Sequence, residues 1–231
     1  RPAAPGAGMA DLEPGSDCPL CPRLESFRLQ NREKLPDFHN APVPCFGPRT
    51  APLLIVGLAP GLQGANRTGR PFTGDFAGDL LYATLLKFGL AAGTYGRRPD
   101  DGMRLVGCRI VNAVRCVPPQ NKPTPAEINT CNRFLKAEIA AMPKLRALLA
   151  LGAIAHGAAL SALGERKSRH RFAHNASHRL AGGLALIDSY HCSRYNTNTG
   201  VLTPAMFEAA VQAARAAADT AATEGAATDA G

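Results

Sequence analysis

The stretch that decides the fold is residues 57–75, which read GLAPGLQGANRTGRPFTGD. It follows the apolar run LLIV at 53–56, which is typical of a strand buried on both faces. It precedes residues 75–90, where apolar side chains recur at the spacing of a helix. The glycines and prolines between the two predict a loop whose backbone can approach a ligand closely. Ligands of parallel α/β sheets bind at the carboxyl ends of strands, so this loop is the first candidate for a binding site.

Three more apolar runs follow, and helical patterns separate them. With the first run they form a set of four predicted strands at 53–56, 109–114, 146–151 and 184–189. Thr124, Pro125 and Glu127 match a helix N-cap, a first-turn proline and a capping box, and further helices are predicted at 152–163 and from Pro204 onward. Strands that alternate with helices predict an α/β fold with a parallel sheet and helices on both faces.

Length and charge narrow the classes of protein that fit. The 231 residues, 45% of them hydrophobic, suffice for one substantial core, so we expect one domain over 17–217. The tails at 1–16 and 218–231 are poor in side chains to bury and are predicted to be disordered. A net charge of +8 favours a polyanionic partner such as nucleic acid. No run of 18 apolar residues occurs and no signal segment is recognised, so no membrane association is expected.

The cysteines suggest a metal site. Seven cysteines without a secretion signal argue against a disulfide framework and for a reducing compartment. Cys18 and Cys21 form a CxxC pair, and Cys116 and Cys131 flank a proline-rich loop and the first turn of a helix. On spacing alone, four thiolates suit zinc and an iron–sulfur cluster equally, and a chance CxxC beside two buried thiols is the alternative. The remaining thiols are expected to be small buried residues: Cys45, Cys108 and Cys192.

Two loops offer polar chemistry. Residues 57–75 match neither a P-loop nor a dinucleotide fingerprint, but they contain cations, an aromatic ring that could stack on a base and a carboxylate that could orient water: Asn66, Arg67, Arg70, Phe72 and Asp75. As alternatives, Asp75 could be a helix N-terminal acid and Phe72 a core residue. His191 follows the fourth predicted strand at the same edge of the sheet. The run at 166–171, with Arg179, is either a solvated loop or a phosphate-contacting surface. Five histidines have no comparable context: His39, His156, His170, His174 and His178.

Four motifs in order carry a family resemblance. They are CPLC, then GLAPG…NRTGRPFTGD, then VNAVRCVPPQNKPTPAE…C…FL, then YHCSRYN. Over about residues 17–215 the chain resembles the iron–sulfur uracil-DNA glycosylases, and the family 5 branch most closely. The resemblance implies a three-layer α/β/α sandwich around a four-stranded parallel sheet. It also implies a [4Fe–4S] cluster on Cys18, Cys21, Cys116 and Cys131.

The resemblance also implies an activity. Family members flip a deaminated base out of DNA, hydrolyse the N-glycosidic bond and leave an abasic site for base excision repair. For this chain it implies uracil, with hypoxanthine and xanthine as further bases, in double-stranded DNA. None of the candidate site residues is a lysine, so a monofunctional enzyme is expected. We expect it to act as a monomer in the cytoplasm of a bacterium or archaeon. A non-catalytic nucleic-acid-binding protein with a structural metal, or a domain that cross-links to abasic DNA, are the alternatives.

The resemblance also implies roles for individual residues of this chain. The catalytic residues would be Asp75, Asn121 and His191. The base would contact Gly57, Leu58, Ala59, Gly61 and Phe72. DNA would contact Asn66, Arg67, Arg70, Ser193, Arg194, Tyr195 and Asn196. Family 4 enzymes have an acidic residue where Leu58 stands, and an apolar side chain cannot act as a base, so the resemblance places the catalytic carboxylate at Asp75.

Overall fold

Strand β1 (Leu53–Gly57) lies inside a five-stranded sheet of order β4-β1-β5-β7-β6. It pairs in parallel with β4 (Cys108–Asn112) on one side and with β5 (Ala147–Leu151) on the other. Strand β7 (Ala185–Ser189) continues the parallel sheet, and β6 (Ser177–Arg179) closes it as an antiparallel edge strand. The chain passes from β1 to β4 on one side and then to β5 on the other, so the topological switch point lies at the carboxyl end of β1.

The predicted α/β/α sandwich is confirmed, with one correction to the number of strands. All four predicted parallel strands are present, but the sheet has five strands rather than four. The additional strand β6 has only three residues, Ser-His-Arg, and lacks the apolar alternation by which strands are recognised in a sequence. A short antiparallel strand of this kind is common at the edge of a parallel sheet.

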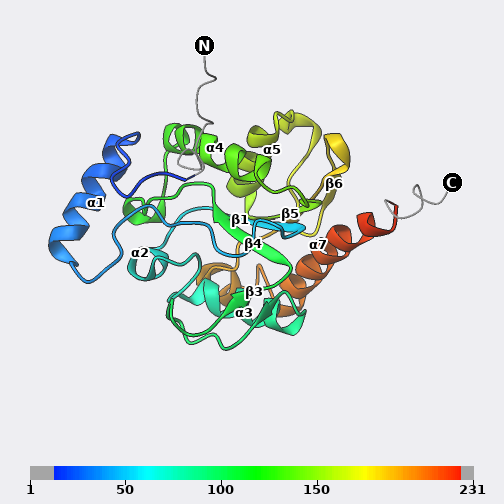
Figure 1. Cartoon of the computed structure of the whole chain (residues 1–231), viewed down its shortest axis with the longest axis horizontal. Coiled ribbons are helices and arrows are strands. Elements are labelled where there is room, and N and C mark those ends of the chain that lie inside the picture. The colour runs from blue at the N-terminus through cyan, green and yellow to red at the C-terminus, as the bar shows by residue number, and fades with distance from the viewer. Residues whose placement is uncertain (1–12, 225–231) are drawn as a thin grey trace, which may run out of the picture.

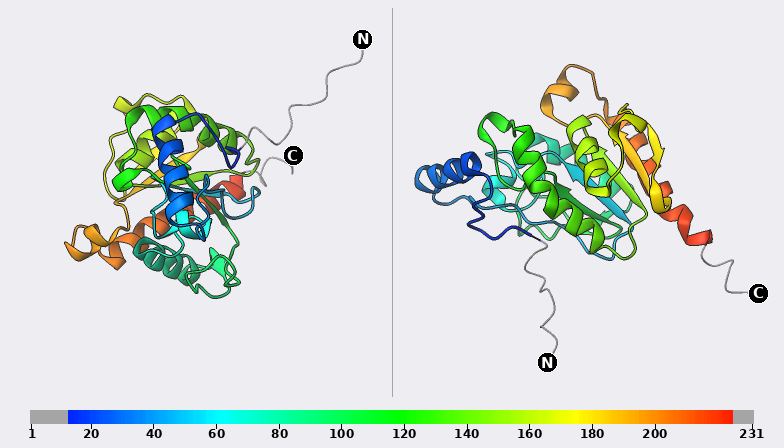
Figure 2. Two further views of the ribbon diagram at one scale, coloured as in Figure 1. Left: turned by 90° about the vertical axis from the view of Figure 1, so that its left-hand side faces the viewer. Right: turned by 90° about the horizontal axis from the view of Figure 1, so that it is seen from above.

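Alternate residues of β1 face the two helical layers (Figures 1 and 2). Leu53 and Ile55 pack in the core that helices α3 (Phe76–Lys87) and α7 (Pro204–Glu224) cover, and Leu54 and Val56 pack in the core under α4 and α5. Helix α4 spans Pro125–Ala140 and begins with the predicted capping box of Thr124 and Glu127; α5 spans Ala153–Leu163. The fully buried strands β1 and β5 therefore consist of apolar residues and glycine, whereas β4 also carries Arg109 and Asn112.

The computed structural model describes residues 13–224. Residues 13–16 are placed rather than disordered, and Glu13 accepts a hydrogen bond of 2.9 Å from the Cys45 N–H. Helix α7 continues to Glu224, past the expected domain end at 217. Residues 1–12 and 225–231 of the predicted tails lie outside the described part.

The remaining elements are α1 Pro22–Lys34, α2 Ala65–Thr68, β2 Ala91–Ala92, β3 Arg104–Leu105, η2 Pro119–Asn121, η3 Lys167–Arg169, η4 Ala181–Gly183 and α6 Arg194–Asn198. No helix of the described chain is long and apolar enough to cross a membrane.

A buried polar network joins α5 to the sheet edge, which the sequence did not indicate. The carboxylate of Asp188 on β7 lies 2.7 Å from Nδ1 of His156 and 2.9 Å from Nε2 of His178. Nε2 of His156 lies 2.9 Å from the His170 carbonyl oxygen. Both ring nitrogens of His156 thus face acceptors, which a neutral imidazole with a single N–H cannot satisfy. Burial by itself would lower the pKa of His156, but the hydrogen bond and charge of Asp188 outweigh it, and the pKa is raised.

This network predicts that stability falls as the pH rises. Protonated His156 binds Asp188 in the folded state, so its contribution is fully present below the unfolded pKa and is lost as the pH passes the raised folded pKa. The urea midpoint of the wild-type protein should therefore decrease between about pH 6 and pH 8. In the His156→Asn variant this dependence should flatten, as followed by circular dichroism. An unchanged slope in the variant would contradict the assignment.

Candidate active site and cysteine site

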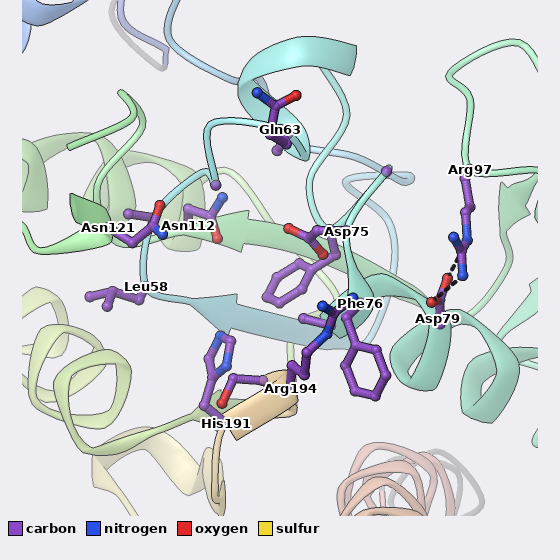
Figure 3. A pocket seen from close by; sticks show the side chains of 17 residues that line it. Leu58, Gln63, Asp75, Phe76, Asp79, Arg97, Asn112, Asn121, His191 and Arg194 are labelled. Atoms are coloured by element: carbon purple, nitrogen blue, oxygen red, sulfur yellow. Dashed lines mark hydrogen bonds and ion pairs between the residues drawn. The ribbon is translucent and has the colours of Figure 1, made fainter. Parts of the chain in front are cut away.

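A cavity of about 610 Å³, here called the main cavity, opens at the carboxyl ends of β1, β4 and β7. Figure 3 shows Asn112, Asp75 and His191 around the same space, with Leu58 and Asn121 to one side. Nine of the sequence-predicted site residues line it: Leu58, Ala59, Gly61, Phe72, Asp75, Asn121, His191, Ser193 and Arg194. The fold therefore brings three separate motifs to one concave surface at the switch point, where α/β sheets bind ligands.

Gly57 ends β1 and allows two cavity residues to approach the strand. A Cβ atom at Gly57 would lie 2.4 Å from the Asn112 side-chain oxygen and 2.6 Å from the Phe72 ring. Gly57 pairs with Asn112 in the sheet register, so the glycine and the asparagine are neighbours at the strand ends. Gly57, which was expected to contact the base, thus leaves space for the side chains of Asn112 and Phe72 because it has no side chain of its own.

Asp75 has the two features considered for it from the sequence. It is the N-cap of α3, where one carboxylate oxygen accepts a 3.1 Å hydrogen bond from the Gly78 N–H, and it also lines the main cavity. The loop backbone encloses the carboxylate, because a Cβ at Gly64 would lie 2.3 Å from its other oxygen. Burial raises the pKa of Asp75, and the nearby charge of Asp79 adds to the effect.

His191 presents its ring to the same cavity. Its ring is stacked relative to Phe72, with centroids 6.0 Å apart. The side-chain amide of Asn196 donates a 2.8 Å hydrogen bond to the His191 carbonyl and fixes the backbone there. Burial lowers the pKa of His191, so the ring is neutral at pH 7 and has one N–H to donate.

Two of the residues expected to contact DNA are structural instead. Asn66 is 1% exposed, and its amide donates a 2.9 Å hydrogen bond to the side chain of Asn40. Arg70 is 5% exposed and binds both carboxylate oxygens of Asp101 at 2.8 Å. Neither side chain is available to a phosphate, so the expectation is corrected for both. Arg67 is exposed, as a DNA contact requires.

The segment after His191 forms the short helix α6 at the cavity rim. Ser193 caps it by accepting a 3.3 Å hydrogen bond from the Asn196 N–H, so Ser193 and Asn196 also have local structural roles. The guanidinium of Arg194 lies over the Phe76 ring at 5.3 Å. Tyr195 is 74% exposed, which makes it the most protruding of the exposed large hydrophobic residues in the described chain. The ring of Tyr195 is therefore open to solvent, and its contact with DNA stays a prediction.

Asn112 is the functional candidate that the sequence reasoning missed. It is buried, lines the main cavity, and its side-chain oxygen has no hydrogen-bond partner within the described residues. An unpaired buried carboxamide is costly, which suggests that a ligand satisfies it. A signal was present, because a polar residue ends strand β4 directly after the apolar pair Ile110 and Val111.

The four cysteines predicted to bind a metal surround one small cavity, here called the cysteine site. Cys18 and Cys21 precede α1, Cys116 follows β4, and Cys131 lies in α4. The Arg115 N–H donates to the Cys131 sulfur at 3.4 Å, and Nη1 of Arg28 lies 3.7 Å from the Cys116 sulfur. Arg28 is buried and its Nε has no partner within the described residues. Buried donors that face sulfur atoms fit a group that holds the cysteines as thiolates.

Burial and spacing further describe what the cysteine site can hold. Burial raises the pKa of Cys116 to about 11 and that of Cys131 to about 12, so the thiols keep their protons unless a metal replaces them. A single zinc ion would bring four thiolate sulfurs to about 3.8 Å from one another. Within the described residues, no three of these sulfurs lie within 4.8 Å of one another.

Comparisons with known proteins agree with this geometry. The family model described as "Uracil DNA glycosylase superfamily" matches residues 44–215. A type-5 uracil-DNA glycosylase of Thermus thermophilus is 47% identical over 195 residues, 82% of this chain and 89% of the relative. One of Mycobacterium tuberculosis is 43% identical over 201 residues, 84% and 75% of the two chains. One of Pyrobaculum aerophilum is 38% identical over 191 residues, 81% and 83% of the two chains.

The match to the family model spans most of the described chain and includes the segments that build the main cavity. The relatives cover both the cavity and most of their own length. Sequence resemblance, fold and cavity position thus lead to the same assignment. The chain belongs to the uracil-DNA glycosylase superfamily, and within it to the type-5 uracil-DNA glycosylases.

Proposed function

We propose that this protein removes uracil, and further deaminated bases such as hypoxanthine and xanthine, from double-stranded DNA by hydrolysing the N-glycosidic bond. The observation that carries the proposal is the arrangement of Asp75, Asn112 and His191 around one cavity at the switch point (Figure 3). A base inside duplex DNA cannot reach such a cavity, so the nucleotide must first be flipped out. The net charge of +8 and the exposed cations Arg67 and Arg194 suit the phosphate backbone.

The cavity supplies the contacts that a flipped base needs. Phe72 offers its ring face for stacking, and Asn112 offers a carboxamide that is free to hydrogen-bond a base edge. The backbone of Leu58 and Ala59 lies along the rim, where amides can bind base oxygens. Asn121 adds a side-chain amide from the loop after β4. The outward Tyr195 would occupy the space that the flipped nucleotide leaves.

The two titratable residues have complementary tasks. As the bond from C1′ to the base breaks, its electron pair moves to the base, and positive charge develops on the sugar. Neutral His191 donates a hydrogen bond to the base oxygen that gains negative charge. Asp75 stabilises the sugar cation and orients the water whose oxygen bonds to C1′. No lysine lines the main cavity within the described residues, which supports hydrolysis without a Schiff base.

We further propose that the cysteine site holds a [4Fe–4S] cluster. Cys18, Cys21, Cys116 and Cys131 would be its ligands, and the iron–sulfur bonds would cross-link α1, α4 and the loop after β4. Ala59 packs against this site and also lines the main cavity, so the cluster would support the loop that meets the base. The free thiols of the described chain suit a reducing cytoplasm, where we expect a monomer.

Incubation with a duplex that contains one uracil tests the function. Strand cleavage after heating in alkali, together with release of free uracil, is the expected result, because abasic sites break in alkali. A duplex with thymine at the same position is the control. Intact strands at high enzyme concentration would contradict the proposal. Cleavage without alkali would contradict the monofunctional mechanism.

Replacement of His191 by alanine should lower the single-turnover rate on uracil DNA by roughly 10²-fold, the typical effect of removing one preorganised donor. The dissociation constant for DNA should change little, because the His191 ring faces the cavity rather than the rim. Rapid-quench kinetics measure the rate, and fluorescence anisotropy with labelled duplex measures binding. Because the His191 ring is already neutral at pH 7, the rate should depend on pH near neutrality in the same way in the wild type and in the variant.

A further inference from the structure

The residue that presents Phe72 to the cavity stands in an unusual conformation. Phe72 has φ = 54°, in the left-handed region that bulky side chains avoid, at a cost of about 1–3 kcal/mol. Such a turn persists only where its surroundings hold it. Phe72 and Asp75 lie on the same turn, at residues 71–75, and both line the main cavity. Whatever holds this turn therefore sets the positions of the stacking ring and of the carboxylate together.

Two tyrosine hydroxyls hold the turn, and neither tyrosine lines the main cavity. The Tyr95 hydroxyl donates to the Phe72 carbonyl at 3.2 Å and accepts from the Gly74 N–H at 3.3 Å. It thus bridges two backbone groups on either side of Thr73. The Tyr82 hydroxyl donates to the Pro71 carbonyl at 2.6 Å, and the two tyrosine rings stack with centroids 4.6 Å apart. Gly78 leaves room for the bridge, since a Cβ there would lie 2.5 Å from the Tyr95 hydroxyl.

Tyr95 comes from the segment between β2 and β3, which is itself anchored to the start of the turn. Asp101 binds Arg70 through two hydrogen bonds of 2.8 Å and also accepts from the backbone N–H groups of Gly96 and Met103. The Arg70 guanidinium lies 6.0 Å from the Tyr95 ring centroid. The Arg70 side chain also donates to Thr73 at 2.7 Å. Arg70, whose burial removes it from DNA, thus belongs to the support of the turn.

We propose that Tyr95 is a positioning residue for catalysis, which fixes Phe72 and Asp75 through its hydroxyl. The inference rests on the proposed glycosylase function. Tyr95 touches neither the cavity nor a base, and acts only through the backbone of the turn. Without the hydroxyl, Phe72 can relax from its left-handed conformation, and the ring and carboxylate lose their fixed geometry. Because small displacements of positioned groups slow a reaction strongly, we expect the rate to fall while DNA affinity is retained.

The variant Tyr95→Phe tests this, because it removes the hydroxyl and keeps the stacked ring. Its matched control is Thr84→Val, which removes a buried hydroxyl that donates to the Leu80 carbonyl at 2.8 Å within α3, away from the turn. We expect Tyr95→Phe to lower the single-turnover rate on uracil duplex about 10-fold. We expect the dissociation constant for a duplex with 2′-fluorodeoxyuridine, which resists hydrolysis, to stay within about 2-fold. Thr84→Val should leave both quantities unchanged.

Three outcomes would contradict either the proposed function or the positioning role of Tyr95. An inactive wild type would contradict the proposed function itself, before Tyr95 is considered. An active wild type with a Tyr95→Phe rate within about 2-fold of it would overturn the positioning role. Rate losses in both Tyr95→Phe and Thr84→Val that follow the decrease in their melting temperatures would also overturn it. Such losses would show a general effect of lowered stability.

Discussion

Replacing Asp75 by asparagine is expected to lower the single-turnover rate on uracil DNA about 10³-fold, within the range typical of a catalytic carboxylate. Asparagine is nearly the same size and can still accept the N-cap hydrogen bond from the Gly78 N–H, so α3 should keep its start. The variant should fold with a melting temperature close to that of the wild type. Rapid-quench kinetics and thermal unfolding measure the two effects separately, and a full rate in the variant would show that the carboxylate is misassigned.

Asp79 provides the matched control, since it also lines the cavity and lies one helical turn further along α3. It forms an ion pair with Arg97 at 2.6 Å, and its loss should change the rate at neutral pH by only a few-fold. The pH profile should respond in a defined direction. Burial raises the pKa of Asp75 and the charge of Asp79 raises it further, and the role proposed for Asp75 requires the ionised form. The rate should therefore fall as the pH drops through that raised pKa.

The acid limb of the pH profile, where the rate falls as the pH drops, distinguishes the two aspartates. In Asp79→Asn a neighbouring negative charge is gone, so the pKa of Asp75 should fall and the acid limb should move to lower pH. In Asp75→Asn the limb should disappear from the residual activity. A limb that stayed in place in both variants would assign it to another group.

Replacing Cys131 by serine should remove the iron and the brown colour of the purified protein. The proposed cluster would bind only the folded state, so its loss should also lower the melting temperature, by about 10 °C if roughly 4 kcal/mol of binding free energy is lost. Cys131 lies in α4 and would be linked through the cluster to the loops before α1 and after β4. Iron analysis, the visible spectrum and thermal unfolding measure these effects.

Cys108 is the control for this replacement. It is a fully buried thiol on β4 whose sulfur hydrogen-bonds to the Leu90 carbonyl at 3.4 Å, outside the cysteine site. Cys108→Ser should cost some stability but keep the full iron content. Iron retained in Cys131→Ser, or a colourless wild type that contains zinc, would contradict the proposed cluster.

The parallel sheet was predictable because its strands contain apolar runs between recognisable caps and glycines. The capping box at Thr124 and the N-cap at Asp75 were readable for the same local reason. Strand β6 was not, since three polar residues at a sheet edge have no pattern of their own. The His156 to Asp188 network also lay beyond reach, because its members are 32 residues apart and meet only through the fold.

The candidate active site could be predicted in part from the sequence, for related reasons. Leu58 and His191 stand just after strand ends, where parallel topology brings them together, and Phe72 belongs to the loop into which β1 leads. Asn66 and Arg70 lie in the same loop, but whether a polar side chain points inward depends on partners such as Asn40 and Asp101 that are distant in the chain. Local sequence shows the chemistry of a side chain, and only the tertiary structure shows which way it points.

The two edges of the sheet bear on how the molecule behaves at high concentration. At one edge, β6 is short and polar, and at the other, Phe46 forms an antiparallel bridge to Ile110 of β4. An open row of backbone donors and acceptors would invite another chain to add a strand, but β6 offers only three residues for such pairing and Phe46 already occupies a position beside β4. Strand-by-strand aggregation through these edges is thereby discouraged.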